Sequence, residues 1–239
     1  MNPLILVYNE VVYRPFLNGL ILIYGFLPIQ DMGIAIILFT IIIRLLIYPL
    51  SHYGLKAQKK MAVLQPKIKE IQEKYKNNKE EQTRRTMELY KEHKTNPFSG
   101  CLLLILQLPV FIALFQVFRY GFDVSSFSYL YSFVPNPDSI NPFFLGIIDV
   151  TKKSIFLSIL VGASQYVQAV TMPQPQASAG GDKPSFSNEF QKAMQTNTKY
   201  MLPFFMAFIS YTLPSALALY FTISNVFVIM QQMIINKKT

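Results

Sequence analysis

Arg44 is the residue whose chemistry stands out in this chain of 239 residues, because it lies inside the apolar run GIAIILFTIIIRLLIYPL. An arginine near the centre of a membrane-spanning helix costs about 2.5–3.5 kcal/mol on insertion scales, so it is a functional candidate. It also lies six residues before Leu50, roughly 9 Å along a helix. Its long side chain could therefore reach the membrane interface instead.

The distribution of carboxylates decides between these readings of Arg44. All 13 acidic residues lie outside the apolar runs or at their edges, so none can pair with the guanidinium inside the membrane. An unpaired buried guanidinium is too costly to leave without water or a partner. The sequence therefore predicts a water-filled pocket around Arg44.

Other polar residues recur at helical spacing in the apolar runs. Each could form a hydrogen bond between helices, which is the commoner role for a single polar residue in a span. Together with an unpaired arginine they favour one shared hydrophilic cavity. The candidates are Thr40, Gln107, Gln165, Gln168 and Asn225.

The elements that must position these residues are apolar helices. The chain is 51% hydrophobic and 15% charged, against roughly 25% charged in soluble domains. A helix needs about 20 residues to cross the ~30 Å hydrocarbon layer. The sequence predicts an all-α polytopic membrane protein with five core transmembrane helices, an N-terminal interfacial helix and a cytoplasmic helical hairpin. The predicted spans cover residues 33–50, 99–118, 154–171, 199–213 and 214–235.

The segment before the first span is apolar but interrupted. Asn9, Glu10 and Arg14 fall within residues 4–28, which favours a helix lying in the outer interface over a sixth span. We expect residues 1–32 to be extracytoplasmic, with no cleaved signal peptide, since a basic n-region and a small-residue cleavage site are missing. The lone cysteine, Cys101, excludes an internal disulfide framework.

Basic residues predict the orientation. Of the 22 Lys and Arg, 17 fall in residues 51–98, 172–200 and 236–239, and this side is expected to be cytoplasmic. The N-terminus and the loop 119–153 then lie outside, and the C-terminus inside. A net charge of +9 on a soluble surface would suggest nucleic acid, but topology explains it better here.

The charged segment 51–98 is expected to form a helical hairpin. Leu64, Ile68, Ile71 and Tyr75 make one apolar stripe, and Asn77-Asn78 is the expected turn. The alternative is a solvated connector without a docking role. The second cytoplasmic loop, 172–198, contains PQPQASAGGDKPS and is expected to be flexible.

The order of several short motifs makes the sequence similar to a known family. It resembles the YidC/Oxa/Alb membrane protein insertases, and within them the bacterial short form without a large periplasmic domain. Arg44 stands where that family carries its groove arginine. The matching segments are GIAIILFTIIIRLLIYPL, NPFSGC (96–101), LPVF (108–111), FLGIID (144–149), LP (202–203), PSALALY (214–220), Asn225 and QQ (231–232).

The resemblance implies a groove open to the cytoplasm and to lipid, which receives the polar tail of a client while its apolar segment slides into the bilayer past Tyr220 and Phe221. It implies that the hairpin recruits partners through Lys59, Lys60, Lys67, Arg84 and Arg85. Implied partners are nascent membrane proteins, membrane lipids, the ribosome, the signal recognition particle or its receptor, and the Sec translocon. It implies a multi-pass protein of the bacterial inner membrane, with no enzymatic activity, cofactor, metal or specific nucleic-acid sequence.

Two features depart from the family pattern. Phe221 stands where members commonly have Trp, and the chain has no Trp, so the slide loses an N–H donor. The sequence stops at Lys237-Lys238-Thr239, so ribosome tethering through a long basic tail is not expected.

Other functions are less consistent with the residues. An ion-coupled transporter would need an acidic residue or histidine within a span, and a hydrolase an activated nucleophile with its base. His52 and His93 lie at a span end and in the hairpin. A small-solute transporter or channel is the alternative that stays open.

Overall fold

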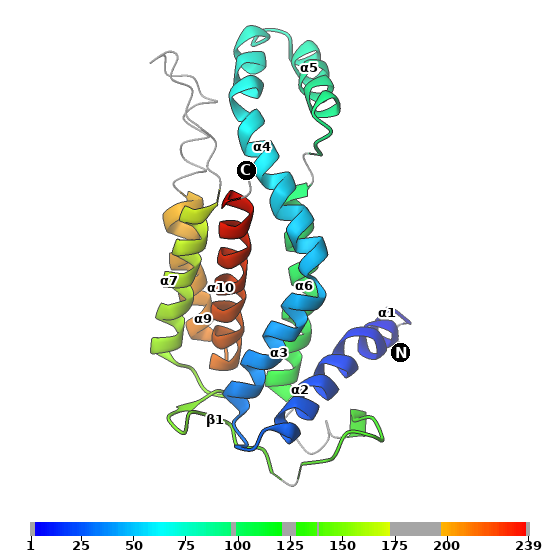
Figure 1. Ribbon diagram of the computed structural model, residues 1–239, viewed down its shortest axis with the longest axis vertical. Coiled ribbons are helices and arrows are strands. Elements are labelled where there is room, and N and C mark those ends of the chain that lie inside the picture. The colour runs from blue at the N-terminus through cyan, green and yellow to red at the C-terminus, as the bar shows by residue number, and fades with distance from the viewer. Residues whose placement is uncertain (1–2, 97–98, 121–127, 138, 173–196, 238–239) are drawn as a thin grey trace.

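The computed structural model describes residues 3–96, 99–120, 128–137, 139–172 and 197–237, without the side chains of 3–5, 99–106 and 120. It is built almost wholly of helices, which confirms the predicted all-α class (Figure 1). Most of the loop 172–198 and the side chain of Cys101 lie outside the described residues. The helices are α1 (Pro3–Tyr8), the π-helical turn η1 (Asn9–Tyr13), α2 (Arg14–Phe26), α3 (Met32–Leu46), α4 (Tyr48–Lys74), α5 (Lys79–Glu92), α6 (Ser99–Tyr120), α7 (Ile155–Thr171), the π-helical turn η3 (Asn197–Met201), α9 (Leu202–Thr212) and α10 (Ser215–Lys237).

The N-terminal helix is packed into the molecule along one face. Leu17, Leu20, Ile21 and Tyr24 recur at helical spacing and are almost fully buried. Asn18, which interrupts the apolar run, docks the helix: its Nδ2 donates to the carbonyl of residue 129 at 3.0 Å, and its Oδ1 accepts the N–H of residue 131 at 2.6 Å. The polar residue Asn18 therefore interrupts the apolar pattern because it binds α2 to the loop at residues 129–131.

The chain bends sharply where α3 meets α4. The two helices are inclined by 67° at the break, and Ile47 is the residue between them. Pro49 lies at the start of α4, and a proline cannot continue a helix through its own position without losing a hydrogen bond and clashing with the preceding turn. Helix α4 then runs without interruption to Lys74, across the boundary expected at residue 50.

Helices α4 and α5 form the hairpin at the top of Figure 1. Leu64 and Ile68 on α4 pack with Leu89 on α5 in a small separate core. Asn78 closes the turn, because its Oδ1 accepts the N–H of Glu81 at 3.1 Å and caps α5.

At the opposite end of the bundle, residues 141–153 form a segment that we name the clasp. Its strands β1 (Phe143–Phe144) and β2 (Ile148–Asp149) pair antiparallel. Asp31 caps α3 by accepting the N–H of Ile34 at 2.9 Å with Oδ1, and its Oδ2 accepts the N–H of Leu145 at 2.6 Å. A methyl group at Gly33 would overlap Phe144, so glycine lets the clasp lie against α3.

The clasp also holds the first turn of α10. The N–H groups of Ser215 and Ala216 donate to the carbonyls of Lys152 and Val150, each at 2.8 Å. The hydroxyl of Ser215 donates to the carbonyl of Asp149 at 3.1 Å. These bonds satisfy N–H groups that a helix start leaves unpaired, and they tie α10 to α3 through one segment.

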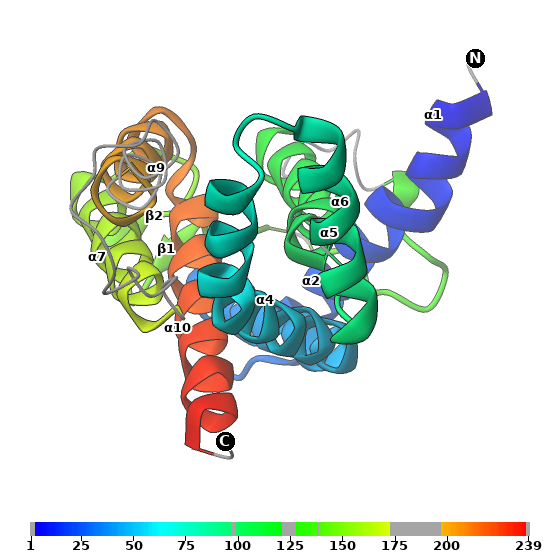
Figure 2. The same ribbon diagram turned by 90° about the horizontal axis from the view of Figure 1, so that it is seen from above.

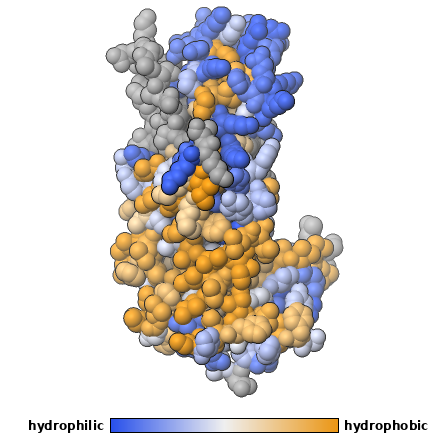
Figure 3. All heavy atoms as spheres, viewed as in Figure 1, coloured by the Kyte–Doolittle hydropathy of each residue, from blue (hydrophilic) through white to orange (hydrophobic). Residues whose placement is uncertain are grey.

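Helices α7, α9 and α10 stand together beside α3, and Figure 2 shows them on one side with α4, α5 and α6 on the other. On the face that Figure 3 shows, the surface of the bundle is mostly apolar and that of the hairpin mostly hydrophilic. By length and composition of the described residues, α10 alone could cross a membrane, and α3 with α4 could form a second, bent span. Helix α7 (Ile155–Thr171) is a shorter apolar helix, and the part of α6 whose side chains are described, Gln107–Arg119, is apolar as well.

Candidate functional site

Arg44 lies in the last turn of α3 and is buried, with 9% of its surface exposed. Helical side chains lean toward the N-terminus of their own helix, so its guanidinium is directed back along α3, away from the hairpin. There Nη2 donates to Oε1 of Gln107 on α6 at 3.0 Å. Among the described residues, Nε of Arg44 has no hydrogen-bond partner.

Gln107 connects Arg44 to α10. Its Nε2 donates to the phenol oxygen of Tyr220, so one amide joins three helices. Tyr220 is 1% exposed and belongs to the central core. The three side chains thus form a chain of hydrogen bonds, cation to amide to phenol, between α3, α6 and α10.

Phe221 lies next to this chain on α10 and is half-buried. Its ring centroid lies 5.5 Å from that of Tyr220 and 5.6 Å from that of Phe111 on α6. Phe221 therefore sits between the polar site and the aromatic ring of Phe111 on α6.

Among the other predicted groove residues, Thr40 and Asn225 donate hydrogen bonds to groups other than Arg44 and Gln107. Thr40 donates to the carbonyl of Ile36 in its own helix at 2.6 Å. Asn225 donates through Nδ2 to Oγ of Ser164 on α7 at 3.0 Å. Gln165 and Gln168 lie half-buried on α7. The structure joins Arg44 and Gln107 directly, whereas Thr40 and Asn225 bond to other groups on α3 and α7.

Sequence reasoning missed the partners that bind α10 to its neighbours. Ser51 on α4 donates to Oε1 of Gln231 at 2.7 Å, and Thr171 on α7 donates to Oε1 of Gln232 at 2.6 Å. Two consecutive glutamines thus reach two different helices. The adjacent glutamines were the only feature of the sequence that could have indicated these contacts. Their partners, Ser51 and Thr171, carry hydroxyl groups of a kind that is common in apolar helices.

The site has the chemistry of a binding surface. A guanidinium presents several N–H donors in a planar fork that suits carboxylates and carbonyls. Its neighbours here are a neutral amide and a phenol. The described residues contain no group of three or more His, Cys, Asp or Glu side chains that could hold a metal ion.

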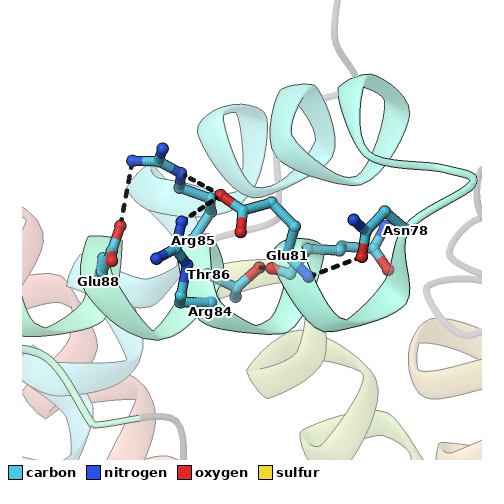
Figure 4. Close-up of polar contacts among 7 residues, drawn as sticks. Asn78, Glu81, Arg84, Arg85, Thr86 and Glu88 are labelled. Carbon is cyan, nitrogen blue, oxygen red and sulfur yellow. Dashed lines mark hydrogen bonds and ion pairs between the residues drawn. The ribbon is translucent and has the colours of Figure 1, made fainter.

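The predicted recruitment cations divide into two groups. On α5, Arg84 and Arg85 both bind Oε1 of Glu81, at 2.7 and 2.9 Å, and Arg85 also reaches Glu88 (Figure 4). Hydrogen bonding from Arg84, and then from Arg85, holds the pKa of the Glu81 carboxyl below its usual value. The positive charges of Arg84 and Arg85 are therefore balanced by Glu81 and Glu88 of the same helix.

The α4 lysines have different surroundings. Nζ of Lys59 lies 3.4 Å from the carbonyl of Ile235 near the end of α10, where a cation suits the helix dipole. Nζ of Lys67 lies 3.4 Å from Nε2 of His93. Lys60 is exposed.

Comparisons with known proteins identify the family of the chain. A family model described as "60Kd inner membrane protein" matches residues 23–239. A membrane protein insertase YidC from Fusobacterium nucleatum is 35% identical over 88% of this chain and 88% of its own length. YidC proteins from Geobacter sp. (strain M21) and Pelodictyon phaeoclathratiforme are 33% and 36% identical over 94% and 95% of this chain. The chain spans only 36% and 37% of the length of those two relatives. It therefore belongs to the 60Kd inner membrane protein family, the family of the YidC/Oxa insertases.

Proposed function

We propose that this protein inserts hydrophobic segments of newly made proteins into the bilayer, and that Arg44 receives the polar tail of the client. Family membership implies a multi-pass protein of the bacterial inner membrane. The observation that carries the proposal is a buried guanidinium that bonds to a neutral amide, Gln107, inside an apolar bundle.

The energetics favour an acidic or polar tail as the ligand. Gln107 accepts from only one nitrogen of Arg44, and Nε has no partner among the described side chains. A hydrogen bond to a charged group contributes about 1.5–3 kcal/mol, and electrostatic attraction is stronger where water is scarce. A client carboxylate or carbonyl could use the spare donors and shorten the apolar distance that its tail must cross.

The exit path of the client follows from the neighbours of Arg44. Phe221, half-buried beside the buried Tyr220, offers an aromatic surface next to the polar chain. A client whose tail is held near Arg44 would lay its apolar segment along the Phe221 ring and leave into lipid. The Phe221 ring supports sliding, because it offers no donor that would hold the segment.

The orientation and the partners are part of the proposal. We infer that α4–α5 lies in the cytoplasm with the C-terminus, because most basic residues are on that side. The distal half of the hairpin, held together by Leu64, Ile68 and Leu89, would dock the ribosome or the targeting and translocation machinery.

Replacing Arg44 tests the proposal. Proteoliposomes with Arg44→Ala should insert a single-span client with an acidic N-terminal tail about 10- to 150-fold less efficiently, if 1.5–3 kcal/mol of transition-state binding is lost. Arg44→Lys keeps the charge but loses the planar fork, and should fall between. The matched control, Lys153→Ala, removes one exposed cation at the clasp. Unimpaired insertion by Arg44→Ala would refute the proposal.

A further inference from the structure

The positive charge of the hairpin is carried by its first arm. Helix α4 contains six Lys and two Glu, whereas α5 contains four basic and four acidic residues. The α5 arginines are paired with Glu81 and Glu88. In the described part of the chain, no ion pair includes Lys56 or Lys60 of α4, and both side chains are exposed.

Helix α4 presents these lysines on a fixed face. Its opposite face is bound to α10, through Ser51 to Gln231 at 2.7 Å and through Leu55, which packs with Val228 and Ile235. At about 100° per residue, Tyr53, Lys56 and Lys60 fall within one narrow arc roughly opposite that contact. The lysines therefore point away from the protein.

The exposed face changes in composition between Leu50 and Lys60, before the exposed Val63. Leu50 at its start is 42% exposed, Tyr53 one turn later is 68% exposed, and Lys56 and Lys60 follow. The order apolar, aromatic, cationic is that of a helix passing from hydrocarbon through the headgroups into water. We name Leu50, Tyr53, Lys56 and Lys60 the α4 stripe.

We propose that the α4 stripe binds the headgroup of an anionic phospholipid. The ammonium groups of Lys56 and Lys60 would contact the lipid phosphate, and the side chains of Leu50 and Tyr53 would contact the acyl chains of the same lipid. A nucleic acid would use the lysines but leave the exposed Leu50 and Tyr53 in water, so the observations favour a lipid. Lys60 is then a lipid contact, and partner recruitment is left to the distal half of the hairpin.

Lipid competition on the full chain tests this inference. Native mass spectrometry of the detergent-solubilised protein would compare binding of phosphatidylglycerol and phosphatidylcholine. A basic residue near an anionic surface contributes about fivefold to binding, so Lys56→Gln/Lys60→Gln should reduce the phosphatidylglycerol preference roughly 25-fold. Inorganic phosphate at equal ionic strength should not displace the lipid.

The matched control removes the same charge from the tip of the hairpin. Lys74 and Lys76 are exposed, and Lys74 lies roughly 21 Å farther along α4 than Lys60, beyond the Debye length of about 8 Å at physiological salt. Lys74→Gln/Lys76→Gln should keep the preference. Equal loss in both variants, no loss in the first, or displacement by inorganic phosphate would overturn the proposal.

Discussion

The contact between the clasp and α3 allows a sharp prediction at Gly33. An added Cβ would overlap the Phe144 side chain, including its own Cβ, so the clasp must move if Gly33→Ala is to fold. Overpacking of this kind typically costs about 1–3 kcal/mol. For a protein of 150–250 residues that corresponds to a melting temperature about 2–12 °C lower.

A glycine elsewhere in the protein provides the control. Gly25 near the end of α2 has open space where a Cβ would stand, so Gly25→Ala should leave the melting temperature unchanged or raise it slightly. Differential scanning fluorimetry of the full chain in detergent measures both variants. In a Phe144→Gly background, Gly33→Ala should cost little further, because both the Cβ and the ring that overlap the added methyl group are gone. Equal stability of Gly33→Ala and wild type, or an undiminished cost without Phe144, would refute the reasoning.

Three further predictions concern single contacts. Gln107→Leu removes the bridging amide and should destabilise the detergent-solubilised protein by about 1.5–3 kcal/mol, more than Tyr220→Phe at about 1 kcal/mol; the reverse order would contradict the hydrogen-bond chain. Asp31→Ala loses a helix cap and a bond to the clasp and should cost about 2–4 kcal/mol in thermal unfolding, with Asp31→Asn intermediate. The Glu81 carboxyl should titrate by NMR below an ordinary glutamate. Its depressed pKa stabilises α5 above the unfolded-state pKa, and this stabilisation is lost as pH falls through the folded-state pKa; replacing both partner arginines by Gln should raise the midpoint.

The sequence was sufficient for the features that depend on local pattern. Arg44 could be singled out as a candidate because a charge inside an apolar run is costly wherever the helix packs, and the structure shows it buried. The all-α class followed from apolar run lengths. Asn77-Asn78 falls in the turn between α4 and α5, where short polar residues favour leaving the helix.

Features that depend on tertiary packing could not be derived from one sequence. Periodicity puts Thr40 and Asn225 on helix faces but does not fix how each helix is rotated, and both make their hydrogen bonds away from Arg44. The contact of Gly33 with Phe144 joins segments more than a hundred residues apart. The bend at Ile47 had a local cause in Pro49, but a proline does not determine the 67° angle between α3 and α4.

Site-specific photocrosslinking tests the central claim most directly. Benzoylphenylalanine at position 221 would be combined with a client arrested during insertion, and the exposed Phe26 at the end of α2 would be the control position. The account predicts that the client crosslinks at position 221 and not at 26, and that the adduct is lost with Arg44→Ala or with a client whose acidic tail is neutralised. A crosslink at position 221 that persists undiminished without Arg44 and without the acidic tail would contradict it.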